Sequence, residues 1–525
     1  MAVNTTSTGR DAERAGTEMG SNSTASTFGE SRVNVFRTKP IAPSPHVDAG
    51  EPVEGSLQGE ATLKRALTAR QLVFLGIGAI IGAGIFVLTG QAAANHAGPA
   101  VTLSFVIAGF ACALAGLCYA EFASLLPVSG SAYSYSYTTL GEIVAWFIGW
   151  NLILEYLFAV ATVAVGWSGY LNGLLGSIGT YFGVSLAIPD ALASAPLAFA
   201  NHRLTATGAI VNLPAIAIVF AIAALCYRGI TQSAMVNNIV VTIKLVVILL
   251  FLGFSLQYVD PANWQPFIPP ADELGRYGWG GVARAASIVF FAYIGFDAIS
   301  TAAQETKNPQ RSMPIGILGS LVVCTLLYIA VCAVLTGMLP YQQLGTAKPV
   351  ATALEAYPKL LWLKTFVEIG AVAGLSSVIL VMTMAQARIF YAMSHDGLIG
   401  KMFGRVHPVY RTPHVGTAFV GAVAMILAGL LPIGVLGDLV SMGTLLAFAT
   451  VCIGVLVLRY TKPDLPRAFR VPGAIIVCPL GALACLGLFF LAFRDNWQWM
   501  SAWIVIGFVV YFTYSMRRSA LNQAR

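Results

Sequence analysis

Long apolar segments separated by short polar connections run through most of this 525-residue chain. A bilayer core roughly 30 Å thick needs about 20 helical residues to cross it, so segments of this length predict membrane-spanning helices. No strand-like alternation of apolar and polar positions competes with them. The pattern therefore predicts an all-α polytopic membrane protein with twelve transmembrane helices. The predicted spans are 71–95, 99–126, 134–176, 208–228, 234–258, 280–304, 314–338, 362–393, 415–433, 436–459, 472–493 and 499–516.

The third predicted span, 134–176, is too long for one perpendicular crossing of the bilayer. It is either one strongly tilted helix or two spans joined near Tyr156. The basic residues favour one helix, because most of the 30 Lys and Arg residues then fall in cytoplasmic tails and loops, as the positive-inside rule requires. Both termini are then cytoplasmic. The loop residues left outside are Arg203, Arg276, Lys348, Lys359, Lys364 and Arg494.

The composition agrees with this pattern, since 57% of the residues are hydrophobic and only 10% are charged, against about 25% in soluble proteins. The formal net charge of +7 follows from the topology and gives no reason to expect a nucleic acid partner. All 8 cysteines fall in apolar spans, without paired spacing in loops. We therefore expect small core cysteines, neither a disulfide framework nor a metal site, and no cofactor.

Residues 1–70 differ from the rest, because Ser, Thr, Gly, Glu and Arg dominate there. Nothing in this stretch resembles a cleavable signal with an apolar segment near its start. It predicts a mostly disordered cytoplasmic N-terminal tail.

The run GIGAIIGAGIF, residues 76–86, places glycines at close intervals inside the first span. It faintly resembles a dinucleotide-binding fingerprint, but the spacing differs, no strand precedes it and no acidic residue follows about 20 positions later. The G-x-x-x-G pattern within it also suits close helix packing. The third interpretation is a helix that is interrupted in mid-membrane.

Interruption gains support from FFAYIGFDA, residues 290–298, in the sixth span. The two glycine-bearing spans are five apart, and corresponding positions in two five-helix halves are where inverted-repeat transporters place their broken helices. The predicted breaks lie at Gly82 and Gly84 in the first span and at Gly295 in the sixth.

A break in mid-membrane frees N–H and C=O groups that cost several kcal/mol each when they face lipid, so they are tolerated only around a polar cavity. Freed N–H groups suit a carboxylate, and freed carbonyl groups suit an ammonium group or a cation. A ligand that carries both groups on one carbon is an α-amino acid, and glycine lets it approach bare backbone. The breaks therefore favour an amino acid substrate.

Several stretches in the right order closely resemble the cationic amino acid transporter branch of the amino acid, polyamine and organocation (APC) superfamily, from about Phe36 to the twelfth span. The resemblance implies a fold like that of the bacterial leucine transporter, with a 5+5 inverted repeat and two peripheral helices. The implied parts are 71–258 and 280–459 for the repeats, 472–516 for the peripheral helices and 517–525 for a cytoplasmic tail. The stretches are LGIGAIIGAGIFVLTG, AYSYSYTTLGE, GWNLILEY, FFAYIGFDAISTAAQETKNPQRSMPIGI and RIFYAMSHDGL.

The same resemblance implies where a substrate binds. Its side chain would point toward the sixth and eighth spans, where Val378 and Met382 could restrict the pocket. The eighth span is mainly small and apolar, so it offers a cationic side chain no acidic partner, and a neutral substrate such as alanine is at least as well supported. The implied residues are Ala83, Gly84 and Ile85 for the α-carboxylate, and Ile80, Phe291, Ala292 and Ile294 for the α-amino group.

Lys244 lies roughly 10 residues from either end of its span, about 15 Å, which is too deep for comfortable snorkelling. A charge there costs at least about 2.5 kcal/mol, so function is the default interpretation and a structural role the alternative. We expect its ammonium group to replace a sodium ion against the broken first span, and family members with this lysine resemble proton-coupled or sodium-independent transporters. Because an ammonium group and Na⁺ repel at close range, we expect Ser376 and Ser377 to bond within their own helix and not to bind sodium.

Glu155 is the second buried ionisable residue, and either it or Lys244 could exchange protons at physiological pH. If the two are close they titrate as a pair, and the alternative for Glu155 is a structural carboxylate bonded to neighbouring helices. The remaining expectations are a gate, or a pairing with Lys307 or Arg311, for Asp297, an outer-interface position for Arg284, and interfacial positions for Glu121 and Glu142.

Together these features predict secondary active transport of an amino acid by alternating access, across the plasma membrane or the inner membrane of a bacterium. Proton symport is the expected coupling, and sodium-independent exchange or an amino-acid-sensing receptor are the alternatives. An intramembrane enzyme is not expected, because none of the 6 histidines lies in mid-membrane next to a nucleophile. The expected partners are the amino acid, protons and the lipid bilayer, with a monomer as one open option for the oligomeric state.

Overall fold

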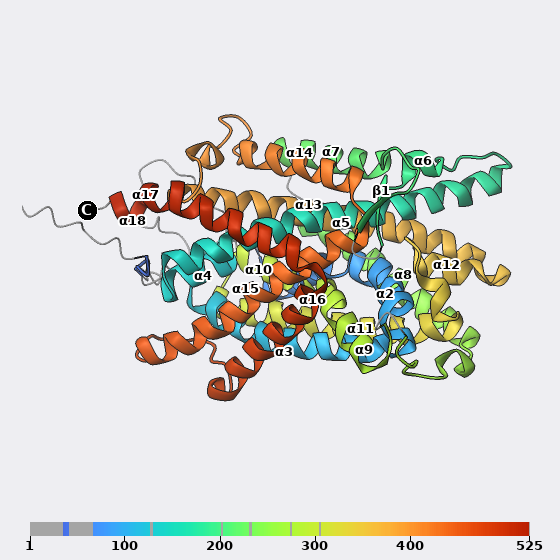
Figure 1. Cartoon of the computed structure of the whole chain (residues 1–525), viewed down its shortest axis with the longest axis horizontal. Coiled ribbons are helices and arrows are strands. Elements are labelled where there is room, and N and C mark those ends of the chain that lie inside the picture. Colours follow the sequence, from blue (N-terminus) through green and yellow to red (C-terminus); the bar gives the residue numbers. More distant parts are fainter. Residues whose placement is uncertain are drawn as a thin grey trace, which may run out of the picture. The chain divides into compact units, whose positions relative to one another are not determined.

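The computed structural model describes residues 35–40, 67–126, 130–200, 203–229, 234–272, 276–303 and 306–523. Most of the predicted N-terminal tail, residues 1–34 and 41–66, lies outside the described residues, and so does the expectation of disorder there. The described part is almost entirely helical (Figure 1).

The described strands pair as one antiparallel hairpin, β1 Leu197–Ala200 with β2 Arg203–Ala206. Short 3₁₀ or π turns join or extend several helices. Those used below are η1 Gly84–Leu88, η2 Ala93–Ala97 and η6 Phe290–Tyr293. The α-helices are α1 Ala69–Ile80, α2 Thr89–Ala92, α3 Val101–Leu125, α4 Ser131–Thr139, α5 Glu142–Phe182, α6 Asp190–Ala193, α7 Leu213–Tyr227, α8 Ala234–Ser255, α9 Gly278–Val289, α10 Phe296–Thr301, α11 Pro309–Met338, α12 Pro349–Glu355, α13 Leu361–His395, α14 His414–Leu430, α15 Ile433–Thr461, α16 Ala474–Val510, α17 Met516–Arg518 and α18 Ala520–Gln523.

Within the described residues, 8 helical segments are long and apolar enough to cross a membrane. Two of them, Ala69–Leu125 and Ala474–Arg518, each correspond to two of the predicted spans. The shorter apolar helices α7 and α14 occupy the predicted fourth and ninth spans. Large apolar side chains such as Ile475 and Ile476 on α16 are exposed, as expected of residues that face lipid. The structure is therefore that of a helical membrane protein.

The predicted third span is corrected at its start. Residues 134–139 belong to the separate helix α4, and the chain turns at Gly141 before α5 begins. Gly141 has a φ of +97°, and a Cβ atom there would lie 2.6 Å from the backbone of Phe36, so the turn requires glycine. From Glu142, α5 continues for 41 residues through Tyr156, so the alternative of two spans joined there is wrong.

The segment Val35–Lys39 completes the hydrogen bonding of this turn. The carbonyl groups of Val35 and Arg37 accept hydrogen bonds from the first two N–H groups of α5, at 3.0 and 2.9 Å, and the N–H group of Lys39 donates to Tyr137 in α4 at 3.0 Å. The first N–H groups of a helix have no partner inside the helix, so this segment supplies what the sequence of α5 cannot. We call Val35–Lys39 the docked segment.

Two side chains anchor the docked segment to distant parts of the chain. Arg37 donates to the carbonyl group of Leu521 at 3.1 Å. The ammonium group of Lys39 pairs with Asp396, just after α13, at 2.7 Å, and Tyr133 of α4 donates to the same carboxylate at 2.7 Å. The segment therefore joins α4, α5, the end of α13 and the last helix.

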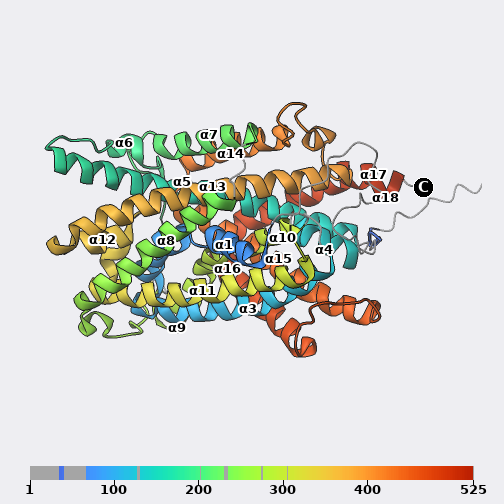
Figure 2. The same cartoon turned by 180° about the vertical axis from the view of Figure 1, so that it is seen from behind.

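The helices enclose α1. Helices α5 and α13 lie side by side along much of their length in both views, and α7 and α14 pair beside them (Figures 1 and 2). Helix α1 packs against α8, α10, α11 and α13. Its carbonyl end is therefore shielded from lipid, which is the setting that an interrupted helix needs. The cysteines are all buried, as predicted for small core residues.

Candidate functional site

The first span is interrupted within its glycine-rich run. Helix α1 ends at Ile80, and Ile81 adopts an extended conformation with a ψ of 97°. Helical structure resumes at Ala83, which precedes the π turn η1. Gly82 lies in this break, and a Cβ atom on it would lie 3.0 Å from Cγ2 of Val378 in α13. The break therefore faces the helix of the predicted eighth span.

The sixth span is interrupted in the same way. Helix α9 tightens into the 3₁₀ turn η6, Ile294 is extended with a ψ of 133°, and Gly295 has a φ of +128° before α10 begins. A positive φ of this size strains any residue that carries a Cβ atom. The glycine allows the chain to leave the helical conformation here without strain.

The two breaks touch backbone to backbone. A Cβ atom on Gly84 would lie 2.4 Å from Cα of Ala292, and one on Gly295 would lie 2.7 Å from the carbonyl carbon of Ala79. No side chain fits at either position, so the glycines permit the contact. The structure thus brings the predicted residues of the first and sixth spans together, in a conformation closed around them. All are buried: Ile80, Gly82, Ala83, Gly84, Ile85, Phe291, Ala292, Ile294 and Gly295.

Met382 is the predicted site residue farthest along the chain from the breaks. It is buried in α13, one helical turn beyond Val378. Val378 is the α13 residue that Gly82 faces at close range. The α13 side chain that packs on the first break is therefore aliphatic, and Met382 lies one turn further along the same helix.

Lys244 donates two hydrogen bonds to the end of α1. Its fully buried Nζ atom lies 2.8 Å from the carbonyl oxygen of Gly78 and 2.8 Å from that of Ile81. These carbonyl groups belong to the end of a helix, where the helix dipole favours a cation. Gly374 makes room for the lysine, because a Cβ atom there would lie 2.8 Å from its Cε atom.

Tyr328 of α11 bridges the two breaks. Its hydroxyl oxygen lies 2.8 Å from the carbonyl oxygen of Ile80 and 2.7 Å from that of Ala292. Sequence reasoning missed this residue, although a tyrosine in the middle of an apolar span needs a partner for its hydroxyl group and was a usable signal. The hydroxyl group occupies the place where two carbonyl groups of different spans converge.

Glu155 does not pair with Lys244 in the described structure. Both carboxyl oxygens of Glu155 lack a hydrogen-bond partner, and its electrostatic neighbours are Asp297 of α10 and Thr444 of α15. Lys244 interacts instead with carbonyl groups of α1. The geometry therefore does not support one titrating pair of Glu155 and Lys244. The ionisable neighbour of Glu155 is the carboxyl group of Asp297.

Asp297 accepts hydrogen bonds at the second break and is not paired with Lys307 or Arg311 among the described residues. Tyr156 of α5 donates to its Oδ2 atom, and the N–H group of Gly295 donates to its Oδ1 atom at 3.1 Å. A carboxylate at the start of a helix commonly accepts from such N–H groups. The carboxylate thus holds α10 to the break and to α5.

The paired serines of α13 behave as predicted. Ser376 donates to the carbonyl group of Val372 at 2.8 Å, and Ser377 donates to that of Gly374 at 2.9 Å. Ser376 also accepts a hydrogen bond from the indole of Trp167 at 2.9 Å. Both hydroxyl groups are engaged within the protein.

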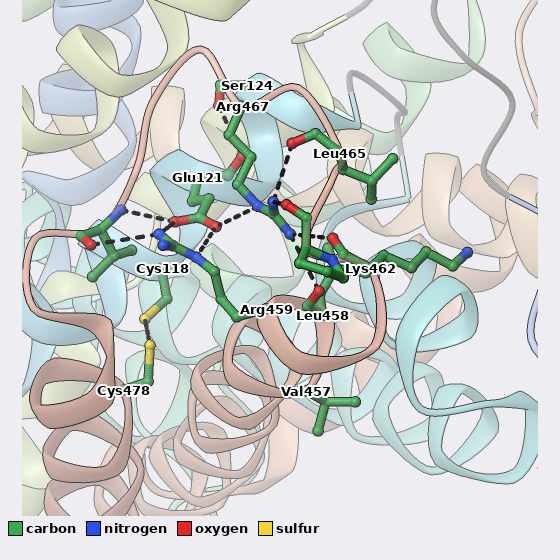
Figure 3. Close-up of polar contacts among 12 residues, drawn as sticks. Cys118, Glu121, Ser124, Val457, Leu458, Arg459, Lys462, Leu465, Arg467 and Cys478 are labelled. Atoms are coloured by element: carbon green, nitrogen blue, oxygen red, sulfur yellow. Dashed lines mark hydrogen bonds and ion pairs between the residues drawn. The ribbon is translucent and has the colours of Figure 1, made fainter.

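Buried ionic clusters lie at the two ends of α15. Glu121 is 2% exposed, and it accepts bidentate hydrogen bonds from Arg459 and one from the N–H group of Val471, with Arg467 at 3.2 Å (Figure 3). The membrane-interface positions of Glu121 and Glu142 stay predictions, because burial within the protein does not fix a depth in the bilayer. Glu142 has a similar polar environment. It is buried and accepts from Tyr137, Tyr511 and Ser519.

At the other end of α15, Arg284 of α9 pairs with Asp438 and with Asp495 of α16, each at 2.7 Å. The side chain of Arg284 is only 11% exposed and that of Asp438 16%, so this pair is largely shielded from water, whereas Asp495 is 41% exposed. The cluster ties α9 to α15 and α16.

Comparison with known proteins places these features in context. A family model described as amino acid permease matches residues 67–514. The branched-chain amino acid permease BcaP of Bacillus subtilis is 47% identical over 494 residues, covering 93% of this chain and 99% of that protein. The methylthioribose transporter of Bacillus subtilis is 46% identical over 462 residues, covering 88% and 96%. Cationic amino acid transporter 4 of Homo sapiens is 36% identical over 437 residues, covering 82% and 65%.

Proposed function

Because this chain belongs to the amino acid permease family, we propose that it is a secondary active transporter that carries a neutral amino acid together with a proton, by alternating access. The observation that carries the proposal is the meeting of two interrupted helices at bare backbone, with the donors Lys244 and Tyr328 converging on their carbonyl groups. Carbonyl groups that already accept from an ammonium and a hydroxyl group suit the ammonium group of an amino acid. The N–H groups that begin η1 suit its carboxylate.

A neutral side chain is supported by the wall that faces the first break. Val378 and Met382 are apolar, and residues 371–385 of α13 contain no acidic side chain. Asp297, beside the second break, already accepts from Tyr156 and Gly295. A cationic side chain buried here would lack a partner, which costs several kcal/mol. Two relatives are named for the transport of branched-chain amino acids and of methylthioribose, which agrees with a neutral substrate.

The proposed architecture has twelve spans, two inverted repeats of five and both termini in the cytoplasm. Helix α1 and the α9–α10 pair are then the first and sixth spans, the matched positions at which such repeats place their interruptions. We propose that α1–α3 and α9–α11 rock against α5, α7, α13 and α14. The site of action is the plasma membrane, or the inner membrane of a bacterium, and the working unit is a monomer.

Lys244 has the proposed role of replacing a bound cation at the end of α1. The change Lys244→Ala leaves the carbonyl groups of Gly78 and Ile81 without this donor. We expect the variant to bind substrate measurably but to lose proton-driven accumulation in proteoliposomes with an imposed pH gradient. Lys359→Ala, which removes an exposed lysine, is the matched control and should accumulate substrate like the unmodified protein.

The same assay separates the other transport modes. Unchanged pH-driven uptake by Lys244→Ala would remove Lys244 from coupling. Uptake by the unmodified protein only when the vesicles contain amino acid identifies an exchanger, and binding without any uptake identifies a sensor. Competition of the twenty amino acids against one labelled substrate tests the neutral preference, which fails if arginine and lysine compete best.

A further inference from the structure

Several buried oxygen atoms near Glu155 have no hydrogen-bond partner in the described structure. They are the two carboxyl oxygens of Glu155 and the hydroxyl oxygens of Tyr119, Ser131 and Tyr135. All four side chains are fully buried, and they come from α3, α4 and α5. Buried polar groups almost always have a partner, and where protein supplies none, water does.

These groups are neighbours. The ring centroids of Tyr119 and Tyr135 are 6.1 Å apart. The electrostatic neighbours of the Tyr119 hydroxyl group are Asp297, Glu155 and Tyr135, with Ser131 beside it. The unpartnered hydroxyl groups are therefore neighbours of one another and of the buried carboxyl groups of Glu155 and Asp297.

Aromatic rings form the walls around these hydroxyl groups. Phe296 of α10 and Phe448 of α15 pack against Tyr119, with centroids 5.6 and 5.1 Å away, and Phe122 stacks on Tyr135 at 4.8 Å. Rings of this kind are at most weak hydrogen-bond acceptors, and the nearby hydroxyl groups are those of Ser131 beside Tyr119 and Ser300 beside Tyr135. Water is the partner that such buried hydroxyl groups commonly take.

The other side of α4 reaches the polar surface. Tyr133, two residues before Tyr135, donates to Asp396 at 2.7 Å, and Asp396 pairs with Lys39, whose side chain is 50% exposed. Ser131 is the first residue of α4 and has a φ of +49°. Helix α4 thus leads from an exposed ion pair to the buried hydroxyl groups, and in the proposed topology this end is cytoplasmic.

We propose that Tyr119, Ser131 and Tyr135 hold a short chain of water molecules through which Glu155 exchanges its proton with the cytoplasm. The inference rests on the proposed proton symport. In the step, the O–H bond of the Glu155 carboxyl group breaks, an O–H bond forms on the nearest water molecule, and each water passes one proton onward. One proton leaves, and the chain of water molecules keeps its composition.

Tyr119 and Tyr135 are positioning residues in this proposal, because they hold water and do not themselves lose a proton. The other groups that face Glu155 are Asp297 of α10, Tyr156 of α5 and Thr444 of α15. Tyr156 donates to Asp297, and Thr444 donates to the carbonyl group of its own helix at Val440. Because Tyr156 and Thr444 each donate to another acceptor, the route that we propose runs along the hydroxyl groups of Tyr119, Ser131 and Tyr135.

The test compares Tyr119→Phe, Tyr135→Phe and the double variant in proteoliposomes. Phenylalanine preserves the ring packing and removes only the hydroxyl group. We expect accumulation driven by a pH gradient to slow about tenfold in the double variant, while counterflow of labelled alanine between equal pH values stays within twofold. We also expect a larger solvent isotope effect in D₂O, because proton release then limits the rate.

Tyr133→Phe is the matched control, since it removes a buried tyrosine hydroxyl group from the same helix, one that already has a protein partner. We expect Tyr133→Phe to leave the ratio of gradient-driven accumulation to counterflow as it is in the unmodified protein. Gradient-driven accumulation by the double variant at the rate of the unmodified protein overturns the water chain and leaves proton symport intact. An equal loss in both assays also overturns it, in favour of a packing role. Failure of the unmodified protein to accumulate substrate under the gradient overturns proton symport itself, and the water chain with it.

Discussion

A tyrosine hydroxyl group carries one proton, yet Tyr328 lies within hydrogen-bonding distance of two carbonyl oxygens, at Ile80 and Ala292. It can donate to only one of them at a time. The two carbonyl groups therefore share the single proton of the Tyr328 hydroxyl group. An ammonium group, with three donors, could satisfy both carbonyl groups at once.

Tyr328→Phe should therefore affect the empty transporter more than the loaded one. Without the hydroxyl group, the closed empty form contains two buried carbonyl groups that have lost their donor, at a cost of about 1–3 kcal/mol. We expect net uptake, which requires the empty form to return, to fall at least about fivefold, while exchange of labelled for unlabelled substrate changes little. The two rates are measured in the same proteoliposomes. An equal fall in both rates would assign Tyr328 a role in the loaded state instead.

At this scale the sequence indicates some residues and hides others. Lys244 and the glycines stand out because a charge or a missing side chain in mid-membrane is unusual on its own. The roles of Tyr328 and Asp297 depend on hydrogen-bond partners that lie 248 and 141 residues away in the sequence, Ile80 and Tyr156. Local patterns carry no information on such contacts, so the pairing of Asp297 with Lys307 or Arg311 was the natural but incorrect expectation.

Helix α15 is fastened to other helices near both of its ends. Near its start, Asp438 pairs with Arg284 of α9, and near its end Arg459 pairs with Glu121 of α3. In the proposed mechanism both partner helices belong to the moving bundle. The ion pairs therefore favour movement of α15 together with that bundle.

The cluster around Glu121 gives a direct stability prediction. Glu121→Gln leaves the guanidinium groups of Arg459 and Arg467 without their carboxylate (Figure 3). Removing one partner of a buried ion pair costs about 3–5 kcal/mol. We expect a clearly lower Tm for the variant in detergent. Burial lowers the pKa of Arg467, and the Glu121 carboxylate opposes that shift. Without the carboxylate, the guanidinium charge of Arg467 lies in surroundings that disfavour it.

Two further variants show whether the loss is specific to the buried pair. Asp272→Asn removes a carboxylate from an exposed pair with Arg276, which is worth at most about 1 kcal/mol, so the Tm should barely change. Adding Arg459→Gln to Glu121→Gln should recover part of the lost stability, because one of the two unpaired guanidinium charges is removed. No recovery would mean that Glu121 acts mainly through the N–H group of Val471.

Element boundaries were predictable where the apolar pattern ends and not where a distant segment intervenes. The third run of apolar residues reads as continuous across residues 134–176, yet α4 and α5 are separate helices. The cause is the docked segment, whose backbone occupies the space beside Gly141. Nothing near Gly141 in the sequence identifies Phe36 as its neighbour.

At the scale of the whole molecule, the docked segment connects parts that are far apart in the sequence. A Cβ atom on Gly141 would collide with the backbone of Phe36. We expect Gly141→Ala to displace the segment and to speed limited tryptic cleavage after Arg37 at least about fivefold, the change that loss of about 1 kcal/mol of docking energy produces. Gly183→Ala is the matched control, because Gly183 also has a positive φ but a Cβ atom there meets nothing within 4 Å. Equal cleavage in both variants would attribute the effect to backbone strain alone.

The broad architecture was the most predictable level. Apolar length, charge placement and the spacing of the two glycine-bearing spans lead to a helical membrane protein with paired interruptions, because membrane insertion and backbone hydrogen bonding leave few other solutions. The clusters around Glu121 and Arg284 could not be predicted in the same way, since each assembles side chains from three or more separate segments.

The docked segment also has a consequence for the order of biosynthesis. Val35–Lys39 emerges from the ribosome before any span, but Asp396 and Leu521, which hold its two basic side chains, are translated much later, Leu521 among the last residues. Because early parts of a chain fold while later parts are still being made, this segment must wait until nearly all of the chain has been inserted. Its closure then marks a fully assembled molecule, and chains that stall before α18 would present the segment, uncovered, to cellular proteases.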